Sequence, residues 1–257
     1  MVKKINITAI VQARLNSQRF QNKVIEKIKD KTILEIIAIR LRESKLINDI
    51  IFAIPGNPNE RLLKKILVKS KLNIFEGNEN DLLDRYYNCA KKNKSDIIVR
   101  ITGDCPLIDP VIVDAVVAGF LGGGYDIFGL SGEFPDGLDC TVFSFGAIEK
   151  AWKEAKLPSE REHVGPYIEK NPDIFKSGGL TLYSDLSFMR WTLDEKADLE
   201  LLKIVFNQLY CEGKVFYTHE ILEFMEANPQ ITKINAGIVR NEGYLKSLLA
   251  EQENSDE

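Results

Sequence analysis

Three cations follow an apolar run close to the N-terminus, and their spacing suits a polyanion. Residues 7–13 are mostly β-branched or apolar, which is typical of a strand buried on both faces of a parallel sheet. Arg14, Ser17, Arg19 and Lys23 come next. Because ligands of open α/β sheets bind at the carboxyl ends of the strands, this pattern predicts a triphosphate site. The alternative is a solvated basic turn, since runs of charge are common on protein surfaces.

A carboxylate, Asp104, follows another predicted buried strand at residues 96–101. A carboxylate at this edge could hold a hard cation, and Mg²⁺ commonly takes one or two carboxylates together with phosphate oxygens. The alternative role is to cap the next helix, but Asp109 ahead of Pro110 is already placed for that. The sequence therefore predicts a metal ligand at Asp104.

The elements that must position these residues alternate between strands and helices in the first half of the chain. Further strands are expected at residues 49–54, 73–75 and 96–101, and helices at residues 32–41, 58–70, 81–90 and from 110 onward. Such alternation predicts right-handed βαβ units and an α/β fold, with a Rossmann-like, mostly parallel sheet flanked by helices. Neither G-x-G-x-x-G after the first strand nor a P-loop sequence is present.

The pattern changes after residue 129. We expect an extended segment at 138–143, a helix at 145–155, antiparallel strands at 180–183 and 188–193, and two closing helices at 196–211 and 218–226. A capping-box pattern at residues 159–162 predicts a further helix start. The expected organisation is one nucleotidyltransferase domain, 1–250, made of a nucleotide-binding half (1–129), an acceptor and dimerisation lobe (130–193) and closing helices (194–250). Residues 251–257 are expected to be a disordered acidic tail.

Composition limits the class of protein. The chain has 257 residues, 44% of them hydrophobic, and a net charge of −4, so no global basic field favours nucleic acid or an anionic membrane. Its four cysteines are scattered and lack zinc-site spacing. No signal peptide and no run of ~18 apolar residues is evident. We therefore expect a cytoplasmic protein.

The opening motif resembles that of a known enzyme family. Q-A-R-L-N-S-Q-R-F-Q-N-K, residues 12–23, resembles the first motif of cytidylyltransferases that activate sugar acids, the CMP-Kdo synthetase and acylneuraminate cytidylyltransferase group. The spore-coat polysaccharide branch, A-R-x-x-S-x-R-L-P-G-K, is the most similar. Phe20-Gln21-Asn22 replaces L-P-G here. Because Asn tolerates positive φ better than most residues, we expect Asn22 to make the turn that Gly makes in the family.

Five later segments agree with the resemblance. Residues 77–87 are similar to the branch's G-x-x-x-D-V-L-D-R-Y-Y, which implies that Asp84 and Arg85 lie near the nucleotide or sugar, although an ordinary amphipathic helix remains an alternative. Residues 101–108 are similar to Q-G-D-x-P-L-I, in which the Asp is a magnesium ligand, with Thr102 in place of the Gln. Residues 190–199 are similar to D-x-D-T-P-E-D-L, which implies a metal-facing Asp194, with a helix N-cap as the alternative, and a structural Asp198. Pro135–Asp139 and Ser159–Val164 also match the branch.

The resemblance implies an enzyme that converts CTP and a sugar acid into a CMP-sugar and pyrophosphate, for surface polysaccharide or glycoconjugate synthesis. It also implies a fold of the nucleotide-diphospho-sugar transferase type with a smaller antiparallel β and helical lobe, Mg²⁺ as cofactor, and a homodimer. The expected nucleotide-binding residues are Ala13, Arg14, Ser17, Arg19, Lys23, Asp84 and Arg85, of which Arg14 and Lys23 are catalytic. The expected metal ligands are Asp104 and Asp194, and the expected acceptor-binding residues are Asp136, Arg161, His163 and Arg190. The alternatives are a nucleotidyltransferase acting on a sugar-1-phosphate or other phosphorylated small molecule, and a non-catalytic nucleotide-binding relative.

Overall fold

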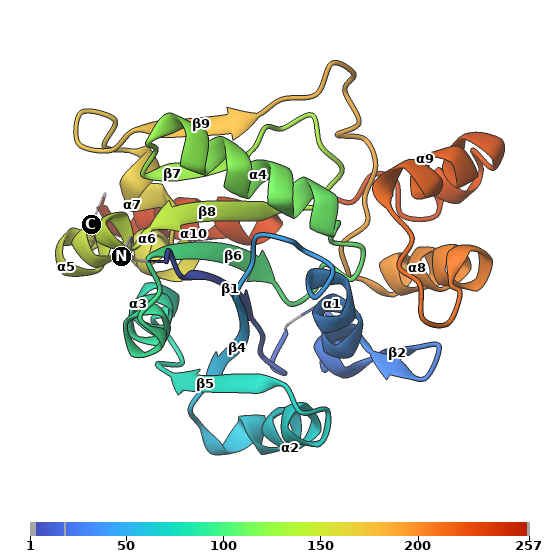
Figure 1. The fold of residues 1–257 in the computed structure, drawn as a ribbon, viewed down its shortest axis with the longest axis horizontal. Coiled ribbons are helices and arrows are strands. Elements are labelled where there is room, and N and C mark those ends of the chain that lie inside the picture. Colours follow the sequence, from blue (N-terminus) through green and yellow to red (C-terminus); the bar gives the residue numbers. More distant parts are fainter. Residues whose placement is uncertain (1–3, 18, 256–257) are drawn as a thin grey trace.

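A seven-stranded sheet organises the computed structural model, which describes residues 4–17 and 19–255 (Figure 1). The strand order is β5-β4-β1-β6-β8-β7-β9. All neighbours pair in parallel except β8, which is antiparallel to both β6 and β7. The strands are β1 (Ile7–Gln12), β4 (Asp49–Pro55), β5 (Asn73–Gly77), β6 (Ile97–Thr102), β7 (Ile127–Leu130), β8 (Cys140–Ser144) and β9 (Ser177–Leu180). A small antiparallel pair joins β2 (Lys27–Ile28) to β3 (Lys31–Thr32). The predicted Rossmann-like, mostly parallel sheet is confirmed.

Helices cover both faces of this sheet. Ala9 and Val11 of β1 pack into the core under α1, α2, α4, α8 and α9, whereas Ile10 between them packs with α3 and α5. In Figure 1, α4 lies in front of β7 and β8, and α6, α7 and α10 lie behind the sheet. The α-helices are α1 (Ile33–Leu41), α2 (Arg61–Lys69), α3 (Leu82–Asn93), α4 (Pro110–Gly123), α5 (Phe145–Glu154), α6 (Pro158–His163), α7 (Pro166–Glu169), α8 (Lys196–Leu209), α9 (Thr218–Ala227) and α10 (Glu242–Ser255). Three short 3₁₀ helices are η1 (Lys23–Ile25), η2 (Pro58–Glu60) and η3 (Ile231–Lys233).

Local capping signals fix where the first helices begin. Thr32 and Glu35 form a reciprocal capping box at the start of α1. The Asp109 carboxylate accepts hydrogen bonds from the backbone N–H groups of Val111 and Ile112 at the start of α4. Each device satisfies backbone donors that a helix start leaves unpaired. Both predicted helix starts are confirmed.

The second half departs from the predictions at several points. The antiparallel strands expected at 180–183 and 188–193 are wrong, because β9 ends at Leu180 and pairs in parallel with β7. Within 188–193 the pairing is one isolated bridge, from Arg190 to Asp136. The capping box expected from Ser159 is also wrong, since α6 begins at Pro158 and Glu160 accepts the backbone N–H of Leu157.

The C-terminal helix α10 replaces most of the expected disordered tail. It runs to Ser255, so residues 251–255 are helical, and residues 256–257 lie outside the described part. The Glu251 carboxylate accepts hydrogen bonds from the backbone N–H and the hydroxyl of Ser159, at 2.5 and 2.9 Å. This contact across the chain gives the acidic segment a partner that its composition does not reveal. In the described residues, no helix combines the length and apolar character needed to cross a membrane.

Candidate active site

A cavity of about 650 Å³ opens at the carboxyl ends of β1 and β6. Three regions of the chain form its walls: the loop after β1 with Asp104 and Asp194, the start of α3, and the facing parts of α6 and α10. The backbone N–H of Gly103 donates to the Gln12 carbonyl at 2.8 Å, and a Cβ on Gly103 would lie 2.7 Å from that oxygen. Glycine is therefore required for the ends of β6 and β1 to approach so closely, and it places Asp104 beside the β1 loop.

Lys23 lies between the two predicted metal ligands. Its Nζ donates to Asp104 Oδ2 at 2.6 Å and to Asp194 Oδ1 at 2.5 Å. Asn22 caps the short helix η1 that carries Lys23, and its φ of 60° is in the left-handed region. The prediction that Asn22 takes over the glycine turn of the family motif is confirmed.

This cluster is largely shielded from solvent, and within it Lys23 and Asp104 stabilise each other's charged forms. The side chains of Lys23, Asp104 and Asp194 are 10%, 24% and 16% exposed. Burial acts to lower the pKa of Lys23, but the two carboxylates outweigh it and raise that pKa above its usual value. Burial acts to raise the pKa of Asp104, but Lys23 outweighs it and lowers that pKa to about 2. Opposite charges stabilise the charged forms on both sides.

Asp104 and Asp194 suit a hard divalent cation. Both carboxylates reach one nitrogen, Lys23 Nζ, so their oxygens converge on a single position. Among the described residues, no group of three or more His, Cys, Asp or Glu side chains could hold a metal ion. A site with two carboxylates fits Mg²⁺, which completes its shell with water and substrate phosphate oxygens rather than with a full protein cage.

The other predicted residues of the β1 loop also line the cavity. Ala13 is buried and its backbone N–H donates to the Ala53 carbonyl at 3.2 Å. Arg14 is exposed, and Ser17 is half-buried. Arg19 contacts Asp194 Oδ2 through Nη2 at 2.8 Å. The structure thus brings the five predicted loop residues together with both predicted metal ligands.

Arg190 and Asp136 have a different position from the one predicted. Neither lines the cavity. Arg190 donates to Asp136 Oδ2 at 2.6 Å, to Asp198 Oδ1 at 3.0 Å and to Asp194 Oδ2 at 3.2 Å, and its side chain is only 7% exposed. Asp198, fully buried, also accepts the backbone N–H groups of Asp194 and Glu195 at 2.8 Å. Arg190 therefore orients Asp194 through a direct contact without lining the cavity itself.

The pKa of Asp136 is raised above the usual value of an Asp side chain. Burial and the neighbouring Asp139 raise its pKa to about 6, although Arg190 and Arg240 act in the opposite direction.

The N-cap of α8 is Glu195, so the alternative role of Asp194 as the cap of that helix is not what the structure shows.

The two residues predicted on α3, Asp84 and Arg85, have different positions relative to the cavity. Arg85 lines the cavity, but its guanidinium donates to the carbonyls of Asn78 and Glu79 at 2.8 and 2.9 Å and so holds the loop before α3. Asp84 does not line the cavity, since it accepts the Trp152 indole N–H at 2.8 Å. Asp84 therefore supports the wall of the cavity and does not line it.

Of the four predicted acceptor residues, only His163 lines the cavity. Arg161 pairs instead with Asp81, the N-cap of α3, with its Nε at 2.8 Å from Asp81 Oδ2. The Nε2 of His163 lies 3.1 Å from Ser247 Oγ on α10. Burial lowers the pKa of His163 below its usual value, so the imidazole is neutral at pH 7.

Several residues of the site carried no recognisable signal in the sequence. Glu60 accepts the backbone N–H of Leu15 with both carboxylate oxygens, at 3.1 and 3.0 Å, and anchors the β1 loop. Glu242, Lys246 and Ser247 of α10 line the cavity. Their segment lies outside every motif, and only the folded chain brings it to the β1 loop.

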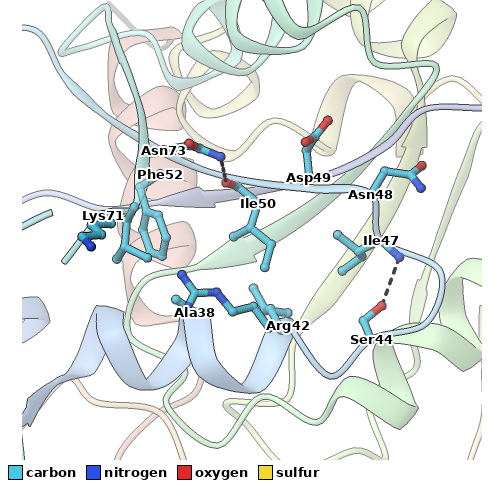
Figure 2. Close-up of a pocket in the computed structure, with 12 residues that line it drawn as sticks. Ala38, Arg42, Ser44, Ile47, Asn48, Asp49, Ile50, Phe52, Lys71 and Asn73 are labelled. Carbon is cyan, nitrogen blue, oxygen red and sulfur yellow. Dashed lines mark hydrogen bonds between the residues drawn. The ribbon is translucent and has the colours of Figure 1, made fainter. Parts of the chain in front are cut away.

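A second cavity lies at the opposite edge of the sheet, around the amino end of β4 (Figure 2). It measures about 250 Å³ and is lined by Arg42, Asp49, Phe52 and Lys71 among others. Figure 2 shows Asn73 donating to the Ile50 carbonyl across it. None of the predicted site residues lines this cavity.

Comparisons with known proteins show the family to which the chain belongs. The family described as cytidylyltransferase matches residues 8–231. An uncharacterised protein of Methanocaldococcus jannaschii is 38% identical over 245 residues, which cover 93% of this chain and 98% of that one. The spore coat polysaccharide biosynthesis protein SpsF of Bacillus subtilis is 25% identical over 238 residues, 87% of this chain and 95% of that one. A cytidylyltransferase structure from Leptospira borgpetersenii superposes with a TM-score of 0.85 at 32% identity, covering 92% of this chain and all of that one. The predicted resemblance is confirmed, and the chain belongs to the cytidylyltransferase family of CTP-dependent nucleotidyltransferases.

Proposed function

We propose that this enzyme transfers CMP from CTP to a small sugar acid with the help of Mg²⁺, giving a CMP-sugar and pyrophosphate. The observation that carries the proposal is the convergence of Lys23, Asp104 and Asp194 at the carboxyl edge of the sheet, beside Arg14 and Arg19. One position thus combines cations for a triphosphate with the oxygen ligands of a hard metal.

Nucleotidyl transfer depends mainly on positioning and on neutralising charge. Arg14, Arg19 and Lys23 bind the triphosphate and offset the charge that develops on the leaving pyrophosphate. Asp104 and Asp194 would hold Mg²⁺, and a bound metal ion supplies charge neutralisation at the α-phosphate. Lys23 is suited to its role because its raised pKa keeps it charged throughout the physiological range.

The acceptor lies against the wall formed by α6 and α10. Since Arg161, Arg190 and Asp136 are engaged elsewhere, His163 is the predicted acceptor residue that remains on this wall. A neutral imidazole can both donate and accept hydrogen bonds, which suits the hydroxyl groups of a sugar. The sugar-acid class itself rests on the family resemblance, as does the expected homodimer, and the cytoplasmic location stays a prediction. The similarity to SpsF supports a role in surface polysaccharide synthesis.

A pyrophosphate-release assay tests this proposal. The enzyme is incubated with Mg²⁺ and each of CTP, UTP, ATP and GTP, and with a 3-deoxy sugar acid, a sialic acid or a sugar-1-phosphate as acceptor. We expect release with CTP and a sugar acid only. Release with the sugar-1-phosphate alone would favour the sugar-phosphate alternative. CTP binding without release from any acceptor would favour a non-catalytic relative.

A further inference from the structure

The C-terminal helix α10 lines the active-site cavity although it lies beyond the family match, which ends at residue 231. It contacts the rest of the chain near its start and again further along. Glu242, at its start, contacts Arg19 of the β1 loop, which is called the triphosphate loop below. Arg19 Nη1 lies 3.0 Å from Glu242 Oε2. Ser247 and Glu251, further along, contact His163 and Ser159 of α6. The helix therefore connects the predicted nucleotide side of the cavity to the predicted acceptor side.

Polar contacts and the edge-on packing of the Tyr244 ring against His163, rather than a buried apolar face, hold α10 in place. None of residues 242–252 is buried, and Leu245 and Leu249 are 47% and 59% exposed. The helix α8 has the same length of 14 residues and buries Leu201, Leu202 and Val205 among others. Displacing a helix with so little buried apolar surface costs little free energy.

Arg19 is shared between the helix and the metal-site carboxylates. Its Nη2 lies 2.8 Å from Asp194, its Nη1 3.0 Å from Glu242 and its Nε 3.9 Å from Glu195. Every nitrogen of the guanidinium thus faces a carboxylate, so a triphosphate that binds Arg19 brings its negative charge close to these carboxylates and is repelled by them. Asp194 is 16% exposed and is also held by Lys23 and Arg190. Glu242 is 35% exposed and belongs to the loosely packed helix, so its contact is the easiest to give up.

The chain before α10 is well placed to act as a pivot. Arg240 is anchored by hydrogen bonds to the Phe134 carbonyl at 2.9 Å and to Asp139 at 3.0 Å. Asn241, next to it, has a φ of 56°. Arg240 lies two residues before the first residue of the helix, Glu242, so α10 can move without disturbing this anchor.

We propose that Glu242 is a positioning residue that couples α10 to the triphosphate loop. In the free enzyme Glu242 holds Arg19 and the helix together, and CTP draws Arg19 away and releases the start of α10 from the cavity wall. This inference rests on the proposed function. It means that the acceptor wall, with Ser247 beside His163, is rearranged only after the nucleotide has bound.

Hydrogen exchange of residues 242–252 and calorimetric CTP binding, both with Mg²⁺ present, test the coupling. Glu242→Gln is compared with Glu251→Gln, which makes the same chemical change on the same helix at its contact with α6. We expect CTP to increase exchange of α10 in the wild type and in Glu251→Gln. In Glu242→Gln exchange is already high and CTP adds nothing. Glu242→Gln should bind CTP about two- to fivefold tighter, as expected when an exposed competing ion pair is removed, while Glu251→Gln binds CTP as the wild type does.

Different results separate the two proposals. If CTP binds the wild type but leaves the exchange of α10 unchanged or lower, the coupling is wrong and the proposed function stands. A weaker affinity of Glu242→Gln for CTP would also overturn the coupling, because Glu242 would then support Arg19 in the complex. If the wild type does not bind CTP at all, the proposed function fails and the coupling fails with it.

Discussion

Replacing Lys23 by Met tests the electrostatics of the site most sharply. Met is one atom shorter than Lys and has no charge, so Asp104 and Asp194 lose the cation that both contact. Removing one partner of a buried ion pair costs about 3–5 kcal/mol. Because the two carboxylates keep 24% and 16% exposure, solvent offsets part of the loss, and we expect about 2–3 kcal/mol. For a chain of this size that is a Tm lowered by roughly 5–10 °C.

Thermal unfolding followed by circular dichroism at pH 7 with a chelator measures this loss. Lys64→Met is the matched control, because Lys64 Nζ lies just as close to Glu76, at 2.6 Å, but both side chains are over 40% exposed. That exposed pair should contribute less than about 1 kcal/mol. Adding Mg²⁺ should stabilise Lys23→Met more than the wild type, since the metal no longer competes with the lysine. Equal Tm values for the two Met variants would show that Lys23 stabilises the fold no more than an exposed ion pair does.

The same variant predicts a pH dependence with a definite sign. Lys23 lowers the pKa of Asp104 to about 2 against the opposing effect of burial, so the folded state favours the ionised carboxylate. The resulting stability is fully present above pH ~4, the pKa of an unfolded Asp, and is lost as the pH falls from about 4 towards 2. The stability difference between the wild type and Lys23→Met should therefore shrink over that range. A constant difference would contradict the pairing.

Three further predictions concern single positions. Asn22→Gly should leave the urea unfolding midpoint nearly unchanged, whereas Asn22→Ala should cost about 1–2 kcal/mol because φ is 60°; equal midpoints would contradict the turn. Arg190→Met should lower the unfolding free energy by about 3–5 kcal/mol, because Asp198 stays buried without its partner. A change confined to the acceptor KM would instead return Arg190 to the acceptor site. Burial lowers the pKa of His163, so stability should fall as the pH drops below ~6.5. Melting curves at pH 7.5 and 5.5 should show a smaller fall for His163→Gln, and an equal fall would contradict that assignment.

Features encoded within a few residues were predictable from the sequence. The capping box of Thr32 and Glu35 and the cap at Asp109 depend only on neighbours along the chain. The turn at Asn22 follows from the tolerance of Asn for positive φ. The edge at which Asp104 and the β1 loop meet follows from the rule that ligands bind at the carboxyl ends of parallel strands.

Features that depend on distant partners were not predictable. Arg161 and Arg190 suit a carboxylate by type, but Asp81 and Asp136, 80 and 54 residues away, take them up. The docking of α10 depends on Ser159, 92 residues from Glu251. A motif identifies which residues are present at a site, whereas the pairing among their charges is decided by the packing of the whole fold.

Turnover of Asp104→Asn and Asp194→Asn tests whether these two carboxylates hold a catalytic metal ion, with Asp185→Asn as an exposed control for the same chemical change. Pyrophosphate release is measured at saturating CTP, Mg²⁺ and the sugar acid that the wild type accepts, after circular dichroism has shown that each variant is folded. An amide cannot replace an anionic metal ligand, so we predict that both site variants lose nearly all turnover while Asp185→Asn keeps it. Turnover within about tenfold of the wild type, ~1.4 kcal/mol in barrier, for either site variant would contradict the metal site and with it this account of catalysis.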